Sequence, residues 1–162
     1  MKKYKSLIIV ISIIVACFAI DVITKTIALN SLELLQENTV INNFFYITLC
    51  YNTGGAWSIF SGNVPLLIIV SLLALALVIY MMTKAESKFY LYSCALFVGG
   101  LIGNLFDRIF YGKVIDFLDF LIFGYDFPIF NVADCFICVG VGLMLLAIIR
   151  EEKKNGNKET SN

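Results

Sequence analysis

The 19 residues from Val64 to Met82, VPLLIIVSLLALALVIYMM, contain no charged side chain. A helix of roughly 20 apolar residues crosses the hydrocarbon core of a bilayer, which is about 30 Å thick. This stretch therefore predicts a membrane-spanning helix. The composition of the whole chain agrees, because 60% of its residues are hydrophobic and only 15% are charged, whereas soluble domains carry about a quarter charged residues.

Three further apolar stretches accompany this one. Residues 89–106 carry no charge, the first stretch is interrupted by Asp21 and Lys25, and the last has Asp134 within its first turn. We expect a membrane protein, mainly α-helical, with a bundle of four spans that form one domain over residues 1–150. The polar tail, residues 151–162, has no apolar periodicity and is expected to be disordered. The spans are expected at about residues 6–29, 64–82, 89–106 and 132–149.

The positive charges predict the orientation, because Lys and Arg are retained on the cytoplasmic side of a membrane. Nine of the twelve fall before the first span, between the second and third, or after the fourth, and three fall on the opposite side. Both termini are therefore expected in the cytoplasm. The opposite side carries eight acids: Asp21, Glu33, Glu37, Asp107, Asp116, Asp119, Asp126 and Asp134.

Two segments join the spans on the acidic side, residues 30–63 and 107–131. Val40–Tyr51 and Phe110–Phe130 are rich in aromatic and β-branched residues, which favours strands. Residues 124–126 supply one of the turns. We expect a small β-rich extracytoplasmic cradle and a second outer loop, both lying on the membrane surface.

The N-terminal segment also fits a secretory signal peptide, because lysines precede an apolar stretch and residues 14–17 have the look of a lipoprotein cleavage box. A tethered lipoprotein would turn polar after its cysteine. Here residues 18–20 continue the apolar stretch and three more spans follow, which favours an uncleaved first span.

The chain has no histidine, which excludes serine–histidine and cysteine–histidine catalysis and zinc sites that use imidazole. A formal net charge of zero gives no reason to expect nucleic acid as a partner. Cys135 and Cys138 lie inside an apolar span without a second ligand pair, so we expect no metal and no cofactor. A disulfide through Cys50 is weakly motivated. Chemistry must come from carboxylates, amides or thiols.

Several polar residues at span ends have structural explanations that compete with functional ones. Asp21 and Lys25 are four residues apart and can form an ion pair on one helix face. Asn131 and Asp134 have the spacing of a helix cap. Asp107 would need a partner at the end of the third span, because a helix C-terminus disfavours an acid.

Two asparagines are harder to explain structurally. Asn104 follows Gly99 and Gly103, whose spacing predicts close helix packing, and Asn52 lies in a tight turn before Gly54. Each amide could hydrogen-bond the backbone or orient a ligand, and both alternatives stay open.

Asp116 is flanked by apolar residues in a segment that should pack back on the membrane. With Asp134 it provides two carboxylates from different segments at one membrane face. If they meet in a low dielectric, the two would share a proton over the working pH range. Such a pair can activate a water as a base and protonate a leaving amine as an acid. Peptide hydrolysis without histidine or metal needs this arrangement.

Five motifs occur in order along the chain. They are DVITK (residues 21–25), NTGGAW (52–57), GNLFDR (103–108), VIDF (114–117) and FNVAD (130–134). Together they resemble the lipoprotein signal peptidases, also called signal peptidase II, from about residue 6 to 150. Gly55 departs from the family, which more often has alanine there.

The resemblance implies an intramembrane aspartic endopeptidase of the bacterial cytoplasmic membrane. It would remove signal peptides from prolipoproteins, cutting just before the diacylglyceryl-modified cysteine, at the extracytoplasmic face. Its partners would be these prolipoproteins and membrane lipids, and we expect a monomer. By the same matching, Asp116 and Asp134 are the catalytic pair. Substrate-pocket positions are Asn52, Gly54, Asn104, Asp107, Arg108, Asn131 and Ala133, and positions that support the site are Asp21, Lys25 and, near the cradle edge, Trp57.

Two other classes of protein stay open at this point. A small four-span transporter or channel subunit would bind cations with intramembrane acids. It would need acids along a path through the membrane, whereas residues 64–82 have no charge and residues 89–106 have only Asn104. A purely structural membrane protein would leave the matched polar positions unexplained.

Overall fold

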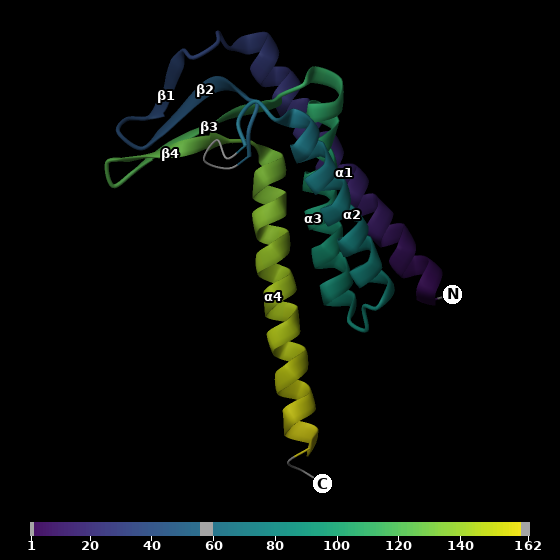
Figure 1. The fold of residues 1–162 in the computed structure, drawn as a ribbon. Helices are drawn as coiled ribbons and strands as arrows, with labels where there is room; N and C mark the ends of the chain where they lie inside the picture. The colour runs from purple at the N-terminus through teal and green to yellow at the C-terminus, as the bar shows by residue number, and fades with distance from the viewer. Residues whose placement is uncertain (1, 56–59, 160–162) are drawn as a thin grey trace.

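The residues that the structure describes fold into four helices and one four-stranded antiparallel sheet (Figure 1). The computed structural model describes residues 2–55 and 60–159, with side chains from Ser6 to Lys154 at the two ends. The predicted bundle of four apolar helices with a small sheet is confirmed. The helices are α1 (Lys2–Ser31), α2 (Val64–Thr83), α3 (Lys88–Tyr111) and α4 (Val132–Glu159), and the strands are β1 (Glu37–Ile41), β2 (Phe45–Asn52), β3 (Val114–Ile122) and β4 (Tyr125–Phe130).

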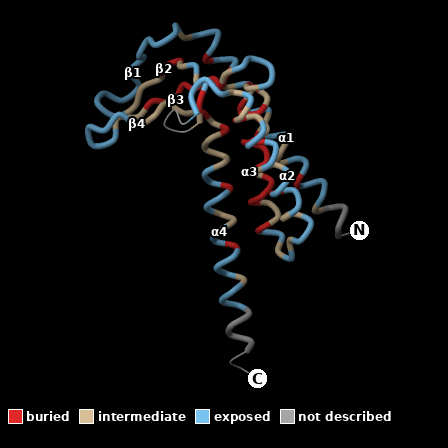
Figure 2. Tube along the Cα trace, viewed as in Figure 1, coloured by how far each residue is buried: buried red, intermediate tan, exposed pale blue. Residues whose placement is uncertain are grey.

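Helix α3 is the centre of the bundle. It packs against α1, α2 and α4, and 56% of its apolar window is buried, against 17% in each of the other three helices (Figure 2). Glycines on α3 permit this packing: a Cβ atom added at Gly99 would lie 2.6 Å from the Cβ of Cys17, and one at Gly100 would collide with the carbonyl oxygen of Ala133. The predicted packing role of Gly99 and Gly103 is confirmed, because Gly103 similarly abuts Asp21.

The three peripheral helices expose large apolar side chains. Ile8 of α1, Leu73 of α2 and Leu145 of α4 are each more than half exposed. Such surfaces are unfavourable in water and suited to lipid. All four helices are long and apolar enough to cross a membrane.

Helix α3 extends further than the sequence suggested. We expected the third span to end at Phe106, but the helix continues through Asp107 to Tyr111 and is capped by Gly112, which has φ 67°. Asp107 is tolerated inside the helix because it binds Lys25 and the backbone of β3. A glycine in the left-handed region is the usual helix terminator.

Helix α4 also runs on, to Glu159, where we expected a disordered tail after residue 150. Residues 151–154 are glutamates and lysines, which have high helix propensity. Extending a helix that already exists needs no new nucleation, so a polar segment can remain helical beyond the apolar span.

The sheet extends sideways from one end of the bundle, called the sheet end from here on (Figure 1). Its strand order is β1-β2-β3-β4. Leu49 of β2 and Ile115 and Phe117 of β3 are buried together with Ala28 of α1, which fixes the inner part of the sheet to the bundle. The strands thus hold residues from two distant parts of the chain beside the first turn of α4.

Candidate active site

Asp116 lies in the middle of the buried part of β3 and is only 2% exposed. In the sheet register it is paired with Cys50 of β2. Its Oδ2 accepts a hydrogen bond from Asn52 Nδ2 at 3.0 Å, and its Oδ1 accepts one from Asn131 Nδ2 at 2.6 Å. The carboxylate is therefore held by two side-chain amides and by no Lys or Arg within the described residues.

Asp134 lies in the first turn of α4, where it forms a reciprocal cap with Asn131. The backbone N–H of Asp134 donates to Asn131 Oδ1 at 3.0 Å, and the backbone N–H of Asn131 donates to Asp134 Oδ2 at 3.1 Å. The predicted helix cap is confirmed. It fixes the Asp134 carboxylate at the helix N-terminus, where negative charge is favoured.

Asn131 connects the two carboxylates, since its side chain binds Asp116 and its backbone binds Asp134. It is completely buried. Asn104 of α3 completes the connection: its Nδ2 donates to Asp134 Oδ1 at 2.7 Å, and its Oδ1 accepts from Asn131 Nδ2 at 3.0 Å. The open question about Asn104 and Asn52 is thereby answered in part, because both amides bind acid side chains of the cluster.

A second pair of carboxylates lies behind the first and is bound by a lysine. Lys25 Nζ is 2.8 Å from Asp21 Oδ2 and 2.8 Å from Asp107 Oδ2, and all three side chains are nearly fully buried. The predicted ion pair of Asp21 and Lys25 is confirmed. The acids also accept backbone hydrogen bonds, Asp21 from Ala133 at 3.0 Å and Asp107 from Ile115 at 3.2 Å, so that the cluster ties α1 and α3 to α4 and β3.

A cavity of about 720 Å³ opens beside these residues. Asp116 and Asp134 both line it. Its walls otherwise come from the ends of β2 and β4, the start of β3, the loop after β2, the C-terminal part of α3 and one face of α4. Of the predicted substrate-pocket residues, Asn52, Asn104 and Arg108 line this cavity, whereas Gly54, Asp107, Asn131 and Ala133 do not line it.

Arg108 braces the loop after β2 against α3. Its Nη2 donates to the carbonyl oxygen of Gly54 at 3.3 Å, and its Nη1 donates to that of Asn104 at 3.4 Å. Its buried Nε has no hydrogen-bond partner among the described residues. The guanidinium therefore supplies positive charge to the cavity with one donor unused.

The environment of Asp116 favours its protonated form. Burial, followed by the nearby charge of Asp134, raises the pKa of Asp116 from 3.8 to about 7. The amides of Asn52 and Asn131 act in the opposite direction. A carboxyl group with a pKa near neutrality can hold or release a proton under physiological conditions, as acid–base catalysis needs.

Sequence reasoning missed several residues of the cavity wall. Cys50, Cys135 and Cys138 line it, as do the four residues Phe127–Phe130 of β4. The position of Cys138 one helical turn after Asp134 could have indicated a shared face. The β4 residues gave no such signal, because only the sheet pairing brings them to the cavity. Trp57, predicted at the cradle edge, lies outside the described residues.

The thiols form no disulfide: Cys17, Cys50, Cys94, Cys135 and Cys138 are all free. Burial, with the charges of Asp116 and Asp119, raises the pKa of the Cys50 thiol, so that this side chain remains a neutral wall residue. Within the described residues, no group of three or more Cys, Asp or Glu side chains could hold a metal ion.

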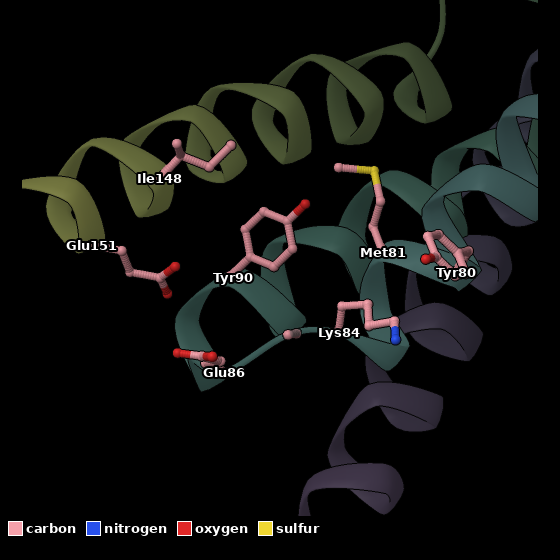
Figure 3. A pocket seen from close by; sticks show the side chains of 8 residues that line it. Tyr80, Met81, Lys84, Glu86, Tyr90, Ile148 and Glu151 are labelled. Carbon is pink, nitrogen blue, oxygen red and sulfur yellow. The ribbon is translucent and has the colours of Figure 1, made fainter. Parts of the chain in front are cut away.

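A smaller cavity, of about 330 Å³, lies at the opposite end of the bundle (Figure 3). Lys84, Glu86, Tyr90 and Glu151 contribute to its wall, and the ring of Tyr90 points into it from α3. Lys84 packs over the ring of Tyr80, and one carboxylate oxygen of Glu151 has no hydrogen-bond partner among the described residues. Its acids are not joined by amides, unlike those of the larger cavity.

Comparison with known proteins places these observations in a family. Residues 13–150 match a family model described as signal peptidase (SPase) II. The lipoprotein signal peptidase of Staphylococcus carnosus is 38% identical over 157 residues, which cover 96% of this chain and 99% of that protein. The lipoprotein signal peptidase of Halalkalibacterium halodurans is 40% identical over 137 residues, which cover 83% of this chain and 88% of that protein.

Solved structures agree with the sequence matches. One bacterial membrane enzyme superimposes with a TM-score of 0.79 at 33% identity, covering 93% of this chain and 90% of its own. Another gives a TM-score of 0.74 at 34% identity, covering 89% and 92% of the two chains. Both the sequence and the fold, with the motif residues gathered beside one cavity, lead to the same conclusion: the chain belongs to the signal peptidase II family.

Proposed function

We propose that this protein is an intramembrane aspartic endopeptidase that removes the signal peptide from prolipoproteins by cleaving just before the diacylglyceryl-modified cysteine. Asp116 and Asp134 are the catalytic residues. The observation that carries the proposal is that both carboxylates line one cavity and are joined through Asn131. The names of the relatives support the substrate class.

In the proposed reaction the two carboxyl groups share one proton. The ionised group takes a proton from a water molecule, and the water oxygen attacks the carbonyl carbon of the residue before the modified cysteine. The protonated group donates its proton to the carbonyl oxygen. When the tetrahedral intermediate collapses, the C–N bond breaks and a proton passes to the departing amine. The products are a signal peptide with a new carboxylate and a lipoprotein with a free cysteine amine.

The other cavity residues have supporting roles in this proposal. Asn52 and Asn104 hold the two carboxylates and face the substrate, and Arg108 provides a donor for a substrate carbonyl. Gly54, Asp107, Asn131 and Ala133 shape the pocket from behind, through the contacts described above. Asp21 and Lys25 maintain the architecture.

The site is proposed to face the extracytoplasmic side, with both termini in the cytoplasm, because most lysines and arginines lie at the opposite end of the bundle. A lipid-anchored substrate would reach the cavity laterally. The bundle surrounds α3 within one chain, which supports a monomer as the working unit.

The test is cleavage of a purified diacylglyceryl-modified prolipoprotein by the Asp116→Asn and Asp134→Asn variants. Each is expected to lose at least roughly a thousandfold in rate, since removing one member of an acid–base pair abolishes both proton transfers. Asp119→Asn is the matched control: Asp119 lies on the same strand, is 7% exposed and accepts a hydrogen bond from Thr48, but it does not line the cavity. The dyad assignment is wrong if either active-site variant retains substantial cleavage or if the control loses as much.

A further inference from the structure

The turn between β3 and β4 places a phenylalanine where the backbone does not favour one. Ile122 pairs with Tyr125, so the loop has only two residues, Phe123 and Gly124, with φ values of 50° and 80°. Positive φ at both positions is the pattern of a type I′ turn, for which Asn-Gly is the favoured sequence. We expected a turn at residues 124–126, but Tyr125 and Asp126 belong to β4.

The other hairpin of the sheet follows the usual preference. In the connection between β1 and β2 the residue with positive φ is Asn43, at 57°. Asparagine tolerates the left-handed region, whereas a bulky side chain is rare there. Asn43 and Phe123 therefore have similar φ values but very different side chains, which points to a role for the Phe123 side chain itself.

Among the residues that the structure describes, no side-chain packing compensates for this backbone conformation. Phe123 is 105% exposed, and its neighbours Ile122 and Tyr125 are exposed as well. The β1–β2 turn lies beside it, because the N–H of Leu121 donates to the carbonyl oxygen of Phe44 at 2.9 Å. Ile41 and Phe44 of that turn are also about half exposed. The far end of the sheet is thus an apolar tip, made of Ile41, Phe44, Ile122, Phe123 and Tyr125.

The apolar tip lies at the level where a helix able to cross a membrane begins. Figure 1 shows that the sheet runs sideways from the bundle and that the β3–β4 turn descends to about the level of the first turn of α4. Helix α4 is one of the helices able to cross a membrane, and its first turn marks the boundary of its apolar segment. By contrast, the connection between α1 and β1 follows the last turn of α1 at the top of the same view, above the level of the β3–β4 turn and of the first turn of α4.

We infer that Phe123 and the apolar tip around it form a membrane anchor that inserts into the lipid leaflet at the sheet end. An aromatic side chain at a turn suits the boundary between headgroups and acyl chains. The anchored turn leads directly into β4, whose residues 127–130 form a wall of the cavity, and it ends β3, which carries Asp116. The anchor thereby holds the cavity wall at the level where a diacylglyceryl group enters, a consequence that rests on the proposed function.

Lipid contact is tested with single-tryptophan proteins in the full-length chain, made in a Trp57→Phe background. The Phe123→Trp probe in phosphatidylglycerol vesicles is expected to be quenched by phospholipids with brominated acyl chains and shielded from aqueous iodide. Leu35→Trp is the matched control, since Leu35 also has positive φ, 61°, and is 68% exposed, but lies in the α1–β1 connection. The tryptophan at position 35 should be quenched by aqueous iodide and not by brominated lipid. The inference is overturned if the probe at position 123 is quenched by iodide as strongly as the control and not by brominated lipid.

The kinetic consequence is tested with Phe123→Asn, which suits the turn backbone and should fold at least as well as the wild type. We expect its KM for a diacylglyceryl-modified prolipoprotein in vesicles to rise roughly threefold to tenfold with kcat nearly unchanged, because an apolar contact with lipid is lost but the chemistry is not. Phe123→Leu, which stays apolar, should restore most of the wild-type KM. An unchanged KM in Phe123→Asn would count against the anchor.

The membrane anchor and the proposed peptidase function can be disproved independently of each other. Iodide quenching at position 123, together with loss of cleavage in Asp116→Asn, would remove the anchor and leave the peptidase. If brominated lipid quenches the probe at position 123 but the Asp116→Asn variant still cleaves, the anchor stands and the catalytic assignment is wrong.

Discussion

Two pairs of buried carboxylates lie side by side at the sheet end, and they are bound in different ways. Asp21 and Asp107 share the ammonium group of Lys25, at 2.8 Å each. Asp116 and Asp134 are bound by the amides of Asn52, Asn104 and Asn131. Only the second pair lines the cavity.

This difference separates structural from chemical roles. A lysine between two acids compensates both charges through direct ion pairs, and here these pairs tie helices together behind the cavity wall. Amides fix the position of a carboxylate while compensating its charge only in part, and so allow a pKa near neutrality. The cation-bound pair should therefore govern stability, and the amide-bound pair should govern catalysis.

Removing the shared cation should have the largest effect on stability. In Lys25→Met, two buried carboxylates lose their partner, and we expect the free energy of unfolding to fall by about 3–5 kcal/mol. Thermal unfolding in detergent measures this loss. Lys84→Met is the control, because Lys84 is exposed at the other end of the bundle and packs over the ring of Tyr80, and it should change stability by less than about 1 kcal/mol. Equal effects of the two substitutions would contradict a structural role for the cation-bound pair.

The Asn131 amide, which joins the two proposed catalytic acids, should matter for rate more than for stability. Asn131→Ser retains a helix-capping oxygen but cannot reach Asp116, so we expect cleavage to fall about tenfold to a hundredfold while the cap remains. Asn131→Ala removes both functions and should in addition lose about 1–2 kcal/mol of stability. A serine variant with the wild-type rate would show that the bond from Asn131 to Asp116 does not orient the acid.

The cation-bound pair can also be disturbed without removing a charge. A Cβ atom at Gly103 would collide with the carboxylate of Asp21, so Gly103→Ala should cost about 1–3 kcal/mol of stability. Gly142→Ala is the control, since nothing lies within 4 Å of the added carbon. It should be neutral or slightly stabilising, as alanine favours helix. Unfolding temperatures of the two variants, measured side by side, check the prediction.

The smallest effect concerns pH. With the pKa of Asp116 raised from 3.8 to about 7, kcat/KM should fall above pH 7 by up to about tenfold per pH unit, because the proton used as the acid is lost. The free energy of unfolding should also fall as pH rises. The unfolded chain releases this proton near pH 4 and the folded protein near pH 7, so the folded protein loses stability between these two pH values. In Asp116→Asn that contribution should vanish. A pH–rate profile that stays flat from pH 6 to 8.5 would contradict a titrating acid at Asp116.

Much of the fold could be predicted because apolar length and charge position encode it directly. The stretch from Val64 to Met82 needs no tertiary information to be recognised as a span. The ends of the helices were harder to predict, because a charged residue such as Asp107 is compensated by Lys25, which is far away in sequence. The same holds for α4, whose extension to Glu159 depends on propagation from a helix already formed.

The acidic residues of the candidate site could be predicted from the sequence, whereas the residues that form the cavity walls could not. Asp116 and Asp134 carry chemistry that few other residues in this chain could supply. The contact of Asn104 with both Lys25 and Asn131 depends on how three helix ends and a strand meet. Phe127–Phe130 reach the cavity only through strand pairing, and the exposure of Phe123 follows from a turn that we predicted at residues 124–126 and that lies at residues 123–124.

The most direct test of the central claim is the unfolding temperature of Asp116→Asn, measured in detergent on the same preparation used for cleavage. The account predicts that cleavage is lost while the unfolding temperature stays within about 4 °C of the wild type, the shift expected for about 1 kcal/mol in a chain of this size. An Asp116→Asn variant that still cleaves, or that unfolds as early as Lys25→Met, would contradict the division between a catalytic pair and a structural pair.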